Sequence, residues 1–205
     1  MQKEFITTPN AYYQPAAQQG TIQRLFYFSK TYNKAAGTIE KDALVYLPYG
    51  YDTEDRDYNV FYLMHGGGGN SDEVFGGSEA TWNVFAKCLN EFQYFLPMSG
   101  DCWAVRMQGG LACPKETVEY LEQSVRKFGE QGQNYRLFVC VGDDGVAYEP
   151  LNTMMQEMKN HTDYFNFGKD FSEGNVIYCV AEGGTHSYEY CYQYIYNALP
   201  YFFKD

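Results

Sequence analysis

The second half of the chain alternates apolar, strand-like runs with helical patterns. Residues 136–141 and 176–180 are apolar almost throughout. Such runs are typical of strands that are buried on both faces of a parallel sheet. A loop and then a helical pattern follow each run, and this alternation is typical of βαβ units. We therefore predict an α/β fold with a mainly parallel sheet and flanking helices, in a single domain over residues 1–205.

Weaker patterns predict the remaining elements. Further strands are expected at residues 21–29, 42–47, 59–64 and 94–98, and helices at residues 79–89, 114–129, around 151–158, and 188–203. Gly129 is expected to end the second of these helices, and Pro200 to break or kink the last one.

Polar or glycine-rich segments follow three of the predicted apolar strands. They are the run from His65 through Gly66, Gly67, Gly68 and Gly69, the pair Asp143 and Asp144, and the loop that ends in His186. Parallel strands end at the same edge of a sheet, and ligands bind beyond that edge. We therefore expect these three segments to meet in one site.

The residue types in these segments suit acyl transfer. His186 lies in a glycine-rich loop and could act as a base, while Asp143 or Asp144 could accept a hydrogen bond from its ring and orient it. The alternatives are a structural histidine and a turn with solvated carboxylates. The acidic spacing does not match a calcium loop of the EF-hand type. His161, at a polar helix end, is expected to be a solvated surface residue.

The four consecutive glycines leave backbone N–H groups free to approach an oxygen closely. Lipases and esterases use such loops to stabilise an oxyanion. A phosphate-binding loop is the alternative, but the G-K-[ST] ending of a P-loop is missing here. The run therefore favours an oxyanion loop formed by Gly66 to Gly69.

Composition excludes several classes of function. The formal net charge of −11 and the lack of a basic cluster argue against nucleic-acid binding. There is no apolar run of 18 residues, so no membrane span is expected, and the first residues show no export signal. Six scattered cysteines without a C-x-x-C pair argue against a metal site, although disulfides are left open. The 21 tyrosines suit sugar or phenolic rings, or simply the packing of strands.

Several segments together resemble the feruloyl and acetyl-xylan esterase branch of the carbohydrate esterases, relatives of esterase D. The matching segments are residues 43–52 (ALVYLPYGYD), 59–70 (NVFYLMHGGGGN) and 94–103 (YFLPMSGDCW), the VGDD loop with Ala147 and Tyr148, the GGTH loop and the ending NALPYFF. The resemblance implies an α/β-hydrolase that releases hydroxycinnamoyl (feruloyl) or acetyl groups from plant xylan, with no metal or other cofactor.

The resemblance also assigns roles to individual residues. It implies that His186 is the base, that Asp144, in preference to Asp143, is the orienting acid, and that His65 with Gly66 to Gly69 forms the oxyanion and substrate loop. Substrate binding is assigned to Asp101, Trp103 and Tyr148, which lie in matching segments. The expected partner is an acylated plant polysaccharide or oligosaccharide. Such esterases are often secreted, but location and oligomeric state are not assigned.

The chain departs from this family where the nucleophilic serine is expected. A G-x-S-x-G elbow should precede the helix that carries Trp82, but only Gly76-Gly77-Ser78-Glu79-Ala80 stands there. The two βα units that the fold needs before the elbow take roughly 60 residues. Fewer than a dozen separate Asn70 from the helix. We interpret this as an internal deletion near residues 70–78. Ser78 is otherwise a replacement nucleophile, or only the N-cap of the helix.

Two other functions remain as alternatives. One is a non-catalytic carbohydrate-binding or remnant domain derived from such an esterase, which would use tyrosines as platforms for sugar rings. The other is an all-β lectin-like module, against which the four amphipathic helical stretches argue. If no nucleophile is present, the chain is expected to hydrolyse esters orders of magnitude more slowly than a complete esterase.

Overall fold

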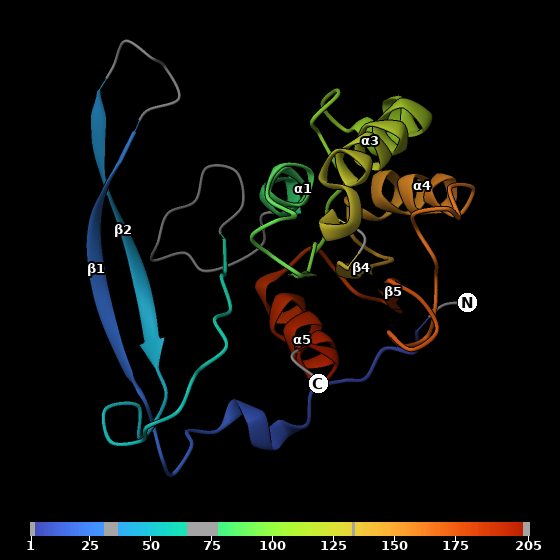
Figure 1. Cartoon of the computed structure of the whole chain (residues 1–205). Helices are drawn as coiled ribbons and strands as arrows, with labels where there is room; N and C mark the ends of the chain where they lie inside the picture. The colour runs from blue at the N-terminus through green and yellow to red at the C-terminus, as the bar shows by residue number, and fades with distance from the viewer. Residues whose placement is uncertain (1–2, 31–36, 65–77, 133, 203–205) are drawn as a thin grey trace. The chain divides into compact units, whose positions relative to one another are not determined.

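The computed structural model describes residues 3–30, 37–64, 78–132 and 134–202 (Figure 1). The chain divides into two compact units, which are considered separately. The larger consists of Met1–Thr8, Leu63–Gly67 and Phe75–Asp205, and the smaller of Pro9–Tyr62 and Gly68–Val74.

The larger unit is built around a parallel sheet with the strand order β3-β4-β5. Strand β4 (Arg136–Gly142) pairs with β5 (Val176–Ala181), and β3 (Tyr94–Phe95) pairs with the start of β4. Two isolated bridges extend the pairing, from Met98 to Cys140 and from Lys3 to Cys179. The parallel arrangement that the apolar runs predicted is confirmed.

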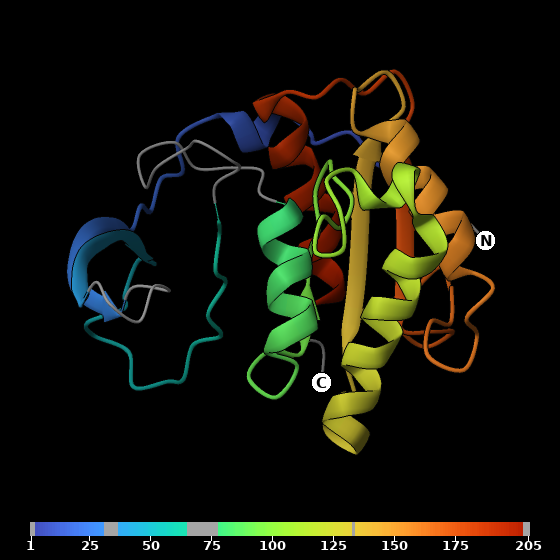
Figure 2. The ribbon, with the colours of Figure 1, turned by 90° about the horizontal axis from the view of Figure 1, so that it is seen from above.

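Helices cover both faces of this sheet. Helices α1 (Ser78–Lys87), α3 (Pro114–Gly132) and α4 (Tyr148–Met158) lie on one face, and α5 (Tyr188–Ala198) lies on the other (Figures 1 and 2). Successive residues of a strand point to opposite faces. Accordingly, Leu137 and Val139 of β4 join the core beneath α1, α3 and α4, whereas Phe138 contacts the rings of Tyr201 and Phe202 beyond α5.

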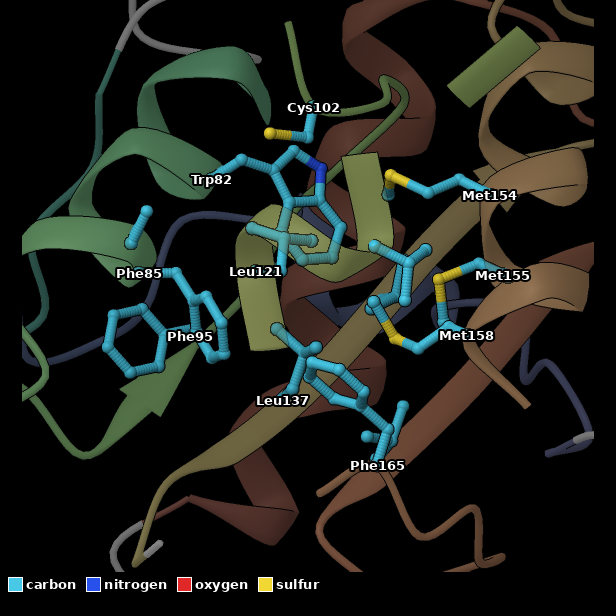
Figure 3. Packing of buried hydrophobic residues seen from close by; sticks show 14 of the residues in the cluster. Trp82, Phe85, Phe95, Cys102, Leu121, Leu137, Met154, Met155, Met158 and Phe165 are labelled. Carbon is cyan, nitrogen blue, oxygen red and sulfur yellow. The ribbon is translucent and has the colours of Figure 1, made fainter. Parts of the chain in front are cut away.

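The main core lies between the sheet and the helices α1, α3 and α4. Figure 3 shows Trp82 and Phe85 of α1 near Leu121 of α3, with the three methionines of α4 on the other side. The Phe85 ring meets that of Tyr135 edge-on, with 4.9 Å between centroids. Trp82 Nε1 donates a hydrogen bond to the carbonyl oxygen of Gly100 at 3.0 Å, so this indole also fixes the loop that follows β3.

The sequence predicted the ends of helices α3 and α5, and only the second prediction is correct. The prediction that Gly129 ends its helix is wrong, because α3 continues to Gly132. An interior glycine costs a helix about 1 kcal/mol relative to alanine, and the fully buried Val118, Leu121 and Val125 outweigh that cost through their packing. Helix α5, in contrast, ends at Ala198, and Pro200 lies in the short 3₁₀ helix η2 (Leu199–Tyr201), as predicted.

The smaller unit contains a two-stranded antiparallel ribbon. Strand β1 (Thr21–Lys30) pairs with β2 (Thr38–Leu47) over ten residues each, and a short 3₁₀ helix, η1 (Asn10–Tyr13), precedes them. Large apolar side chains of the ribbon are exposed, among them Ile22, Phe26 and Phe28, the last at 73%.

The strand predicted at residues 59–64 does not form, so that prediction is wrong. A strand needs a neighbour that pairs with its N–H and C=O groups, and no ladder within the described residues includes this segment. Its apolar side chains are largely exposed, including those of Val60 and Tyr62.

Candidate active site

Two loops meet beyond the carboxyl ends of β4 and β5. The N–H of Asp144 donates a hydrogen bond to the carbonyl oxygen of Gly184 at 2.9 Å, and the N–H of Asp143 donates to Ala181 at 3.2 Å. The backbones approach so closely that a Cβ atom on Gly142 would lie 2.2 Å from the carbonyl oxygen of Gly184. Only glycine fits at position 142 without a shift of the neighbouring loop.

Asp143 holds the histidine loop in place. Its Oδ1 accepts a hydrogen bond from the N–H of Gly183 at 2.7 Å. Gly183 has a φ of +66°, in the left-handed region that favours glycine, so a residue with a side chain would strain the turn at this position. The Asp143 carboxylate therefore binds the backbone of the histidine loop. The carboxylate of Asp144 does not have this role.

His186 lies at the end of the same loop and is exposed, as is Asp144. The β4–α4 loop passes beside it, because a Cβ atom on Gly145 would lie 3.1 Å from the backbone N and 3.5 Å from the Cβ of His186. The structure thus brings the segments of Asp144 and His186 side by side at the sheet edge. Among the described residues, no hydrogen bond joins the His186 ring to either carboxylate. Such bonds are often long in empty sites.

Asp101 and Trp103 lie in the loop after β3, and Asp101 organises that loop. Only 3% of Asp101 is exposed. Its Oδ1 accepts a hydrogen bond from Trp103 Nε1 at 2.7 Å, and its Oδ2 accepts one from the N–H of Gly110 at 2.6 Å. The residue Trp103 is 40% exposed. Asp101 therefore fixes the orientation of an aromatic ring that solvent can reach.

Tyr148 and Cys102 lie close to these loops. Tyr148 is the first residue of α4, is half-buried, and packs against the main core. Cys102 is fully buried, and this burial raises the pKa of its thiol to about 11. A thiol with such a pKa is protonated at neutral pH, so Cys102 is not suited to replace a serine nucleophile.

The predicted nucleophile and oxyanion loop fall where the structure is not described. His65, Gly66, Gly67, Gly68 and Gly69 all lie outside the described residues. Ser78 is the first residue of α1, but its side chain also lies outside them. The position of either group relative to His186 thus stays a prediction.

The prediction that His161 is a solvated surface residue is wrong. Its ring Nδ1 lies 2.6 Å from Glu122 Oε2, and its Nε2 lies 3.4 Å from Glu157 Oε1. Only 15% of the His161 side chain is exposed. Glu122 belongs to α3 and Glu157 to α4, so the histidine links these two helices instead of facing water.

The structure offers no sign of a resident metal or of a membrane helix within the part that it describes. None of its described His, Cys, Asp and Glu side chains form a group of three or more that could hold a metal ion. None of the described helices is long and apolar enough to cross a bilayer.

Comparison with known proteins reveals one consistent group of relatives. No family model matches the chain. It is 27% identical to endo-1,4-beta-xylanase Y of Acetivibrio thermocellus over 282 aligned positions, which include 98% of this chain and 25% of that protein. The chain therefore spans about a quarter of the length of this curated relative. Since 98% of 205 residues is about 201, some 80 aligned positions have no residue of this chain opposite them.

Two solved structures resemble the chain along nearly its whole length. One is a serine-to-alanine mutant of the feruloyl esterase module from Clostridium thermocellum in complex with sinapinate, with a TM-score of 0.82 and 27% identity. The other is a structure designated FAE, with a TM-score of 0.78 and 27% identity. Each match covers 98% of this chain and 94% of the other. The predicted α/β fold class and the predicted resemblance to feruloyl esterases are both confirmed.

Proposed function

We propose that this chain is an ester hydrolase domain of the feruloyl esterase type that acts on acylated xylan. The observation that carries this proposal is the close contact between Gly142 and Gly184, which brings the loops of Asp144 and His186 together. These loops follow the carboxyl ends of adjacent parallel strands, where α/β proteins bind their ligands. The 27% identity to a feruloyl esterase module supports the same reaction class.

In this proposal His186 is the general base and Asp144 orients its ring. The ring takes a proton from the attacking hydroxyl group and returns it to the leaving alcohol. The carboxylate accepts a hydrogen bond from the other ring nitrogen and stabilises the imidazolium that forms. The use of Asp143 to hold the Gly183 backbone supports the choice of Asp144 for this role. The N–H groups of Gly66 to Gly69 would bind the oxyanion.

Trp103 supplies a surface for the substrate. Its indole is tied to the buried Asp101 and is partly exposed, so it is an ordered aromatic face that a phenolic or sugar ring could contact. Tyr148 begins the helix that follows the Asp144 loop, and its hydroxyl group would add a hydrogen bond to the substrate.

We infer that the central segment with the nucleophile elbow is deleted near residues 70–78. The roughly 80 aligned positions of xylanase Y without a counterpart support this inference, since two βα units and an elbow would take about that length. Without that serine the remaining groups are expected to accelerate ester hydrolysis only weakly. Ser78 is a replacement nucleophile only if its hydroxyl comes within hydrogen-bonding reach of His186.

A direct assay tests the role of His186. The full chain should hydrolyse methyl ferulate or 4-nitrophenyl acetate slowly, because the base acts without its usual nucleophile, and His186→Ala should remove this activity. Tyr13→Ala, which changes an exposed ring in the smaller unit, serves as the control and should leave the rate unchanged. Equal rates for the wild type and His186→Ala would contradict the proposal.

A second function is favoured by the ordered, partly exposed indole of Trp103. As a non-catalytic domain, the chain would bind xylan through such rings without cleaving it. Affinity for xylo-oligosaccharides that is lost in Trp103→Ala, together with no ester turnover above that of buffer, would favour this function over the esterase.

A further inference from the structure

A hollow lies in the larger unit, away from the candidate active site. It encloses about 610 Å³, a volume within the range of pockets for small molecules. Its wall combines three aromatic rings with polar side chains, namely Tyr94, Phe171 and Tyr201 with Gln93, Arg136 and Asp170. Pockets that bind ligands typically combine aromatic surface with a few polar groups in this way.

The hollow lies at the amino end of the sheet. Tyr94 is the first residue of β3 and Arg136 the first residue of β4, and these strands are parallel. Asp144 and His186 follow the opposite ends of β4 and β5. Because β4 has seven residues, the two sites are about 20 Å apart along the strand. A ligand in the hollow would therefore not occupy the candidate active site.

The aromatic rings of the hollow are fixed by their neighbours. The Phe171 ring is stacked on that of Phe202, with 6.4 Å between centroids and 14° between planes, and it meets Tyr201 edge-on at 6.3 Å. The guanidinium carbon of Arg136 lies 5.8 Å from the centroid of Phe171. Tyr94 contacts Phe202 at 5.2 Å. Rings that are already ordered lose little conformational entropy when a ligand binds.

The hollow carries charges of both signs at its wall, and the ammonium group of Lys3 lies 5.3 Å from the centroid of the Tyr201 ring. Arg136 and Asp170 carry opposite charges, and Asp170 Oδ1 also accepts hydrogen bonds from the N–H and the hydroxyl group of Ser172. Gln93 is exposed and adds an amide that can donate and accept. The chain as a whole carries a net charge of −11, which disfavours polyanions. A sugar chain has apolar C–H faces and many hydroxyl groups, and so matches both parts of this wall.

We propose that this hollow is a second, non-catalytic binding site for a neutral sugar chain. The rings of Tyr94 and Tyr201 contact sugar faces, and Gln93, Arg136 and Asp170 bind the hydroxyl groups. The site keeps the protein on a polysaccharide while the other edge of the sheet remains free for an acyl group. The choice of xylan as this polysaccharide rests on the proposed function, whereas the site itself does not.

Titration calorimetry of the full chain with xylohexaose tests the proposal. Saturable binding is expected. Gln93→Ala and Tyr201→Leu should each raise the dissociation constant about tenfold, because each removes roughly one net hydrogen bond or ring contact. Tyr13→Ala, with its exposed ring in the smaller unit, should bind as the wild type does. Urea unfolding of each variant identifies any that are not folded. Gln93 is exposed, so its variant should fold even if Tyr201→Leu does not.

Two results would overturn this proposal. One is a wild type without saturable binding at millimolar xylohexaose. The other is binding that Trp103→Ala abolishes and that Gln93→Ala and Tyr201→Leu leave unchanged, since the ligand would then occupy the candidate active site. Hydrolysis of methyl ferulate, which has no sugar chain, is measured in parallel. A failure of the second site therefore leaves the ester assay, and the function proposed from it, unaffected.

Discussion

At the scale of single residues, close backbone contacts position the candidate site. The Gly142–Gly184 contact and the bond from Gly183 to Asp143 set the place of the loop that carries His186. The sequence indicated this region, because glycines and carboxylates follow two apolar runs. The sequence did not indicate the hydrogen bond from the Gly183 N–H to Asp143 or the one from Trp103 to Asp101. These bonds depend on the conformation of irregular loops, which the spacing of apolar residues does not predict.

Asp143→Ala should loosen the histidine loop. The change removes an acceptor for the N–H of Gly183, and a hydrogen bond of this kind contributes about 1 kcal/mol net. Amide hydrogen exchange in residues 182–187 should become faster, and the free energy of unfolding should fall by about that amount. Asp163→Ala, at another exposed aspartate, is the control. Unchanged exchange in the loop would show that Asp143 does not hold it.

At the scale of elements, burial decided which predictions were correct. Strands β4 and β5 and helix α4 were predicted correctly because their apolar patterns match the faces they bury. The segment 59–64 has an equally apolar pattern and forms no strand, because a strand also depends on the neighbours that pair with it. The contact of His161 with Glu122, 39 residues earlier, could not be read from local patterns either.

Glu122→Gln should destabilise the packing of α3 on α4. Glu122 and His161 are each about 15% exposed, and a hydrogen bond that involves a charged group typically contributes about 1.5–3 kcal/mol. We expect a loss near the lower end of this range in urea unfolding, because the pair is close to the surface. Glu119→Gln is the matched control, since Glu119 is half-exposed and lies 3.9 Å from Lys115, and it should change stability by less than about 0.5 kcal/mol. Equal effects of the two changes would refute a linking role for His161.

At the scale of the whole molecule, the proposed deletion would explain both the exposed apolar ribbon and the lack of a G-x-S-x-G elbow in the sequence. A two-stranded ribbon is marginally stable alone, and the exposed Ile22, Phe26 and Phe28 of this one are typical of strands that normally have partners. The segment 59–64 also joins no strand ladder within the described residues. The proposed deletion would account for all three features if it removed central strands together with the elbow.

Restoration of the deleted segment tests this explanation. The aligned positions of xylanase Y that have no counterpart here would be inserted between Asn70 and Ser78. On this explanation the insertion supplies a serine nucleophile and strands for the sheet. Turnover of methyl ferulate should then rise by about three orders of magnitude or more, and the midpoint of thermal unfolding should also rise. His186→Ala in the same chimera should abolish the gain in turnover but leave the gain in stability. A chimera that is more stable but no more active would show that the deletion is genuine and that His186 and Asp144 no longer form a working pair.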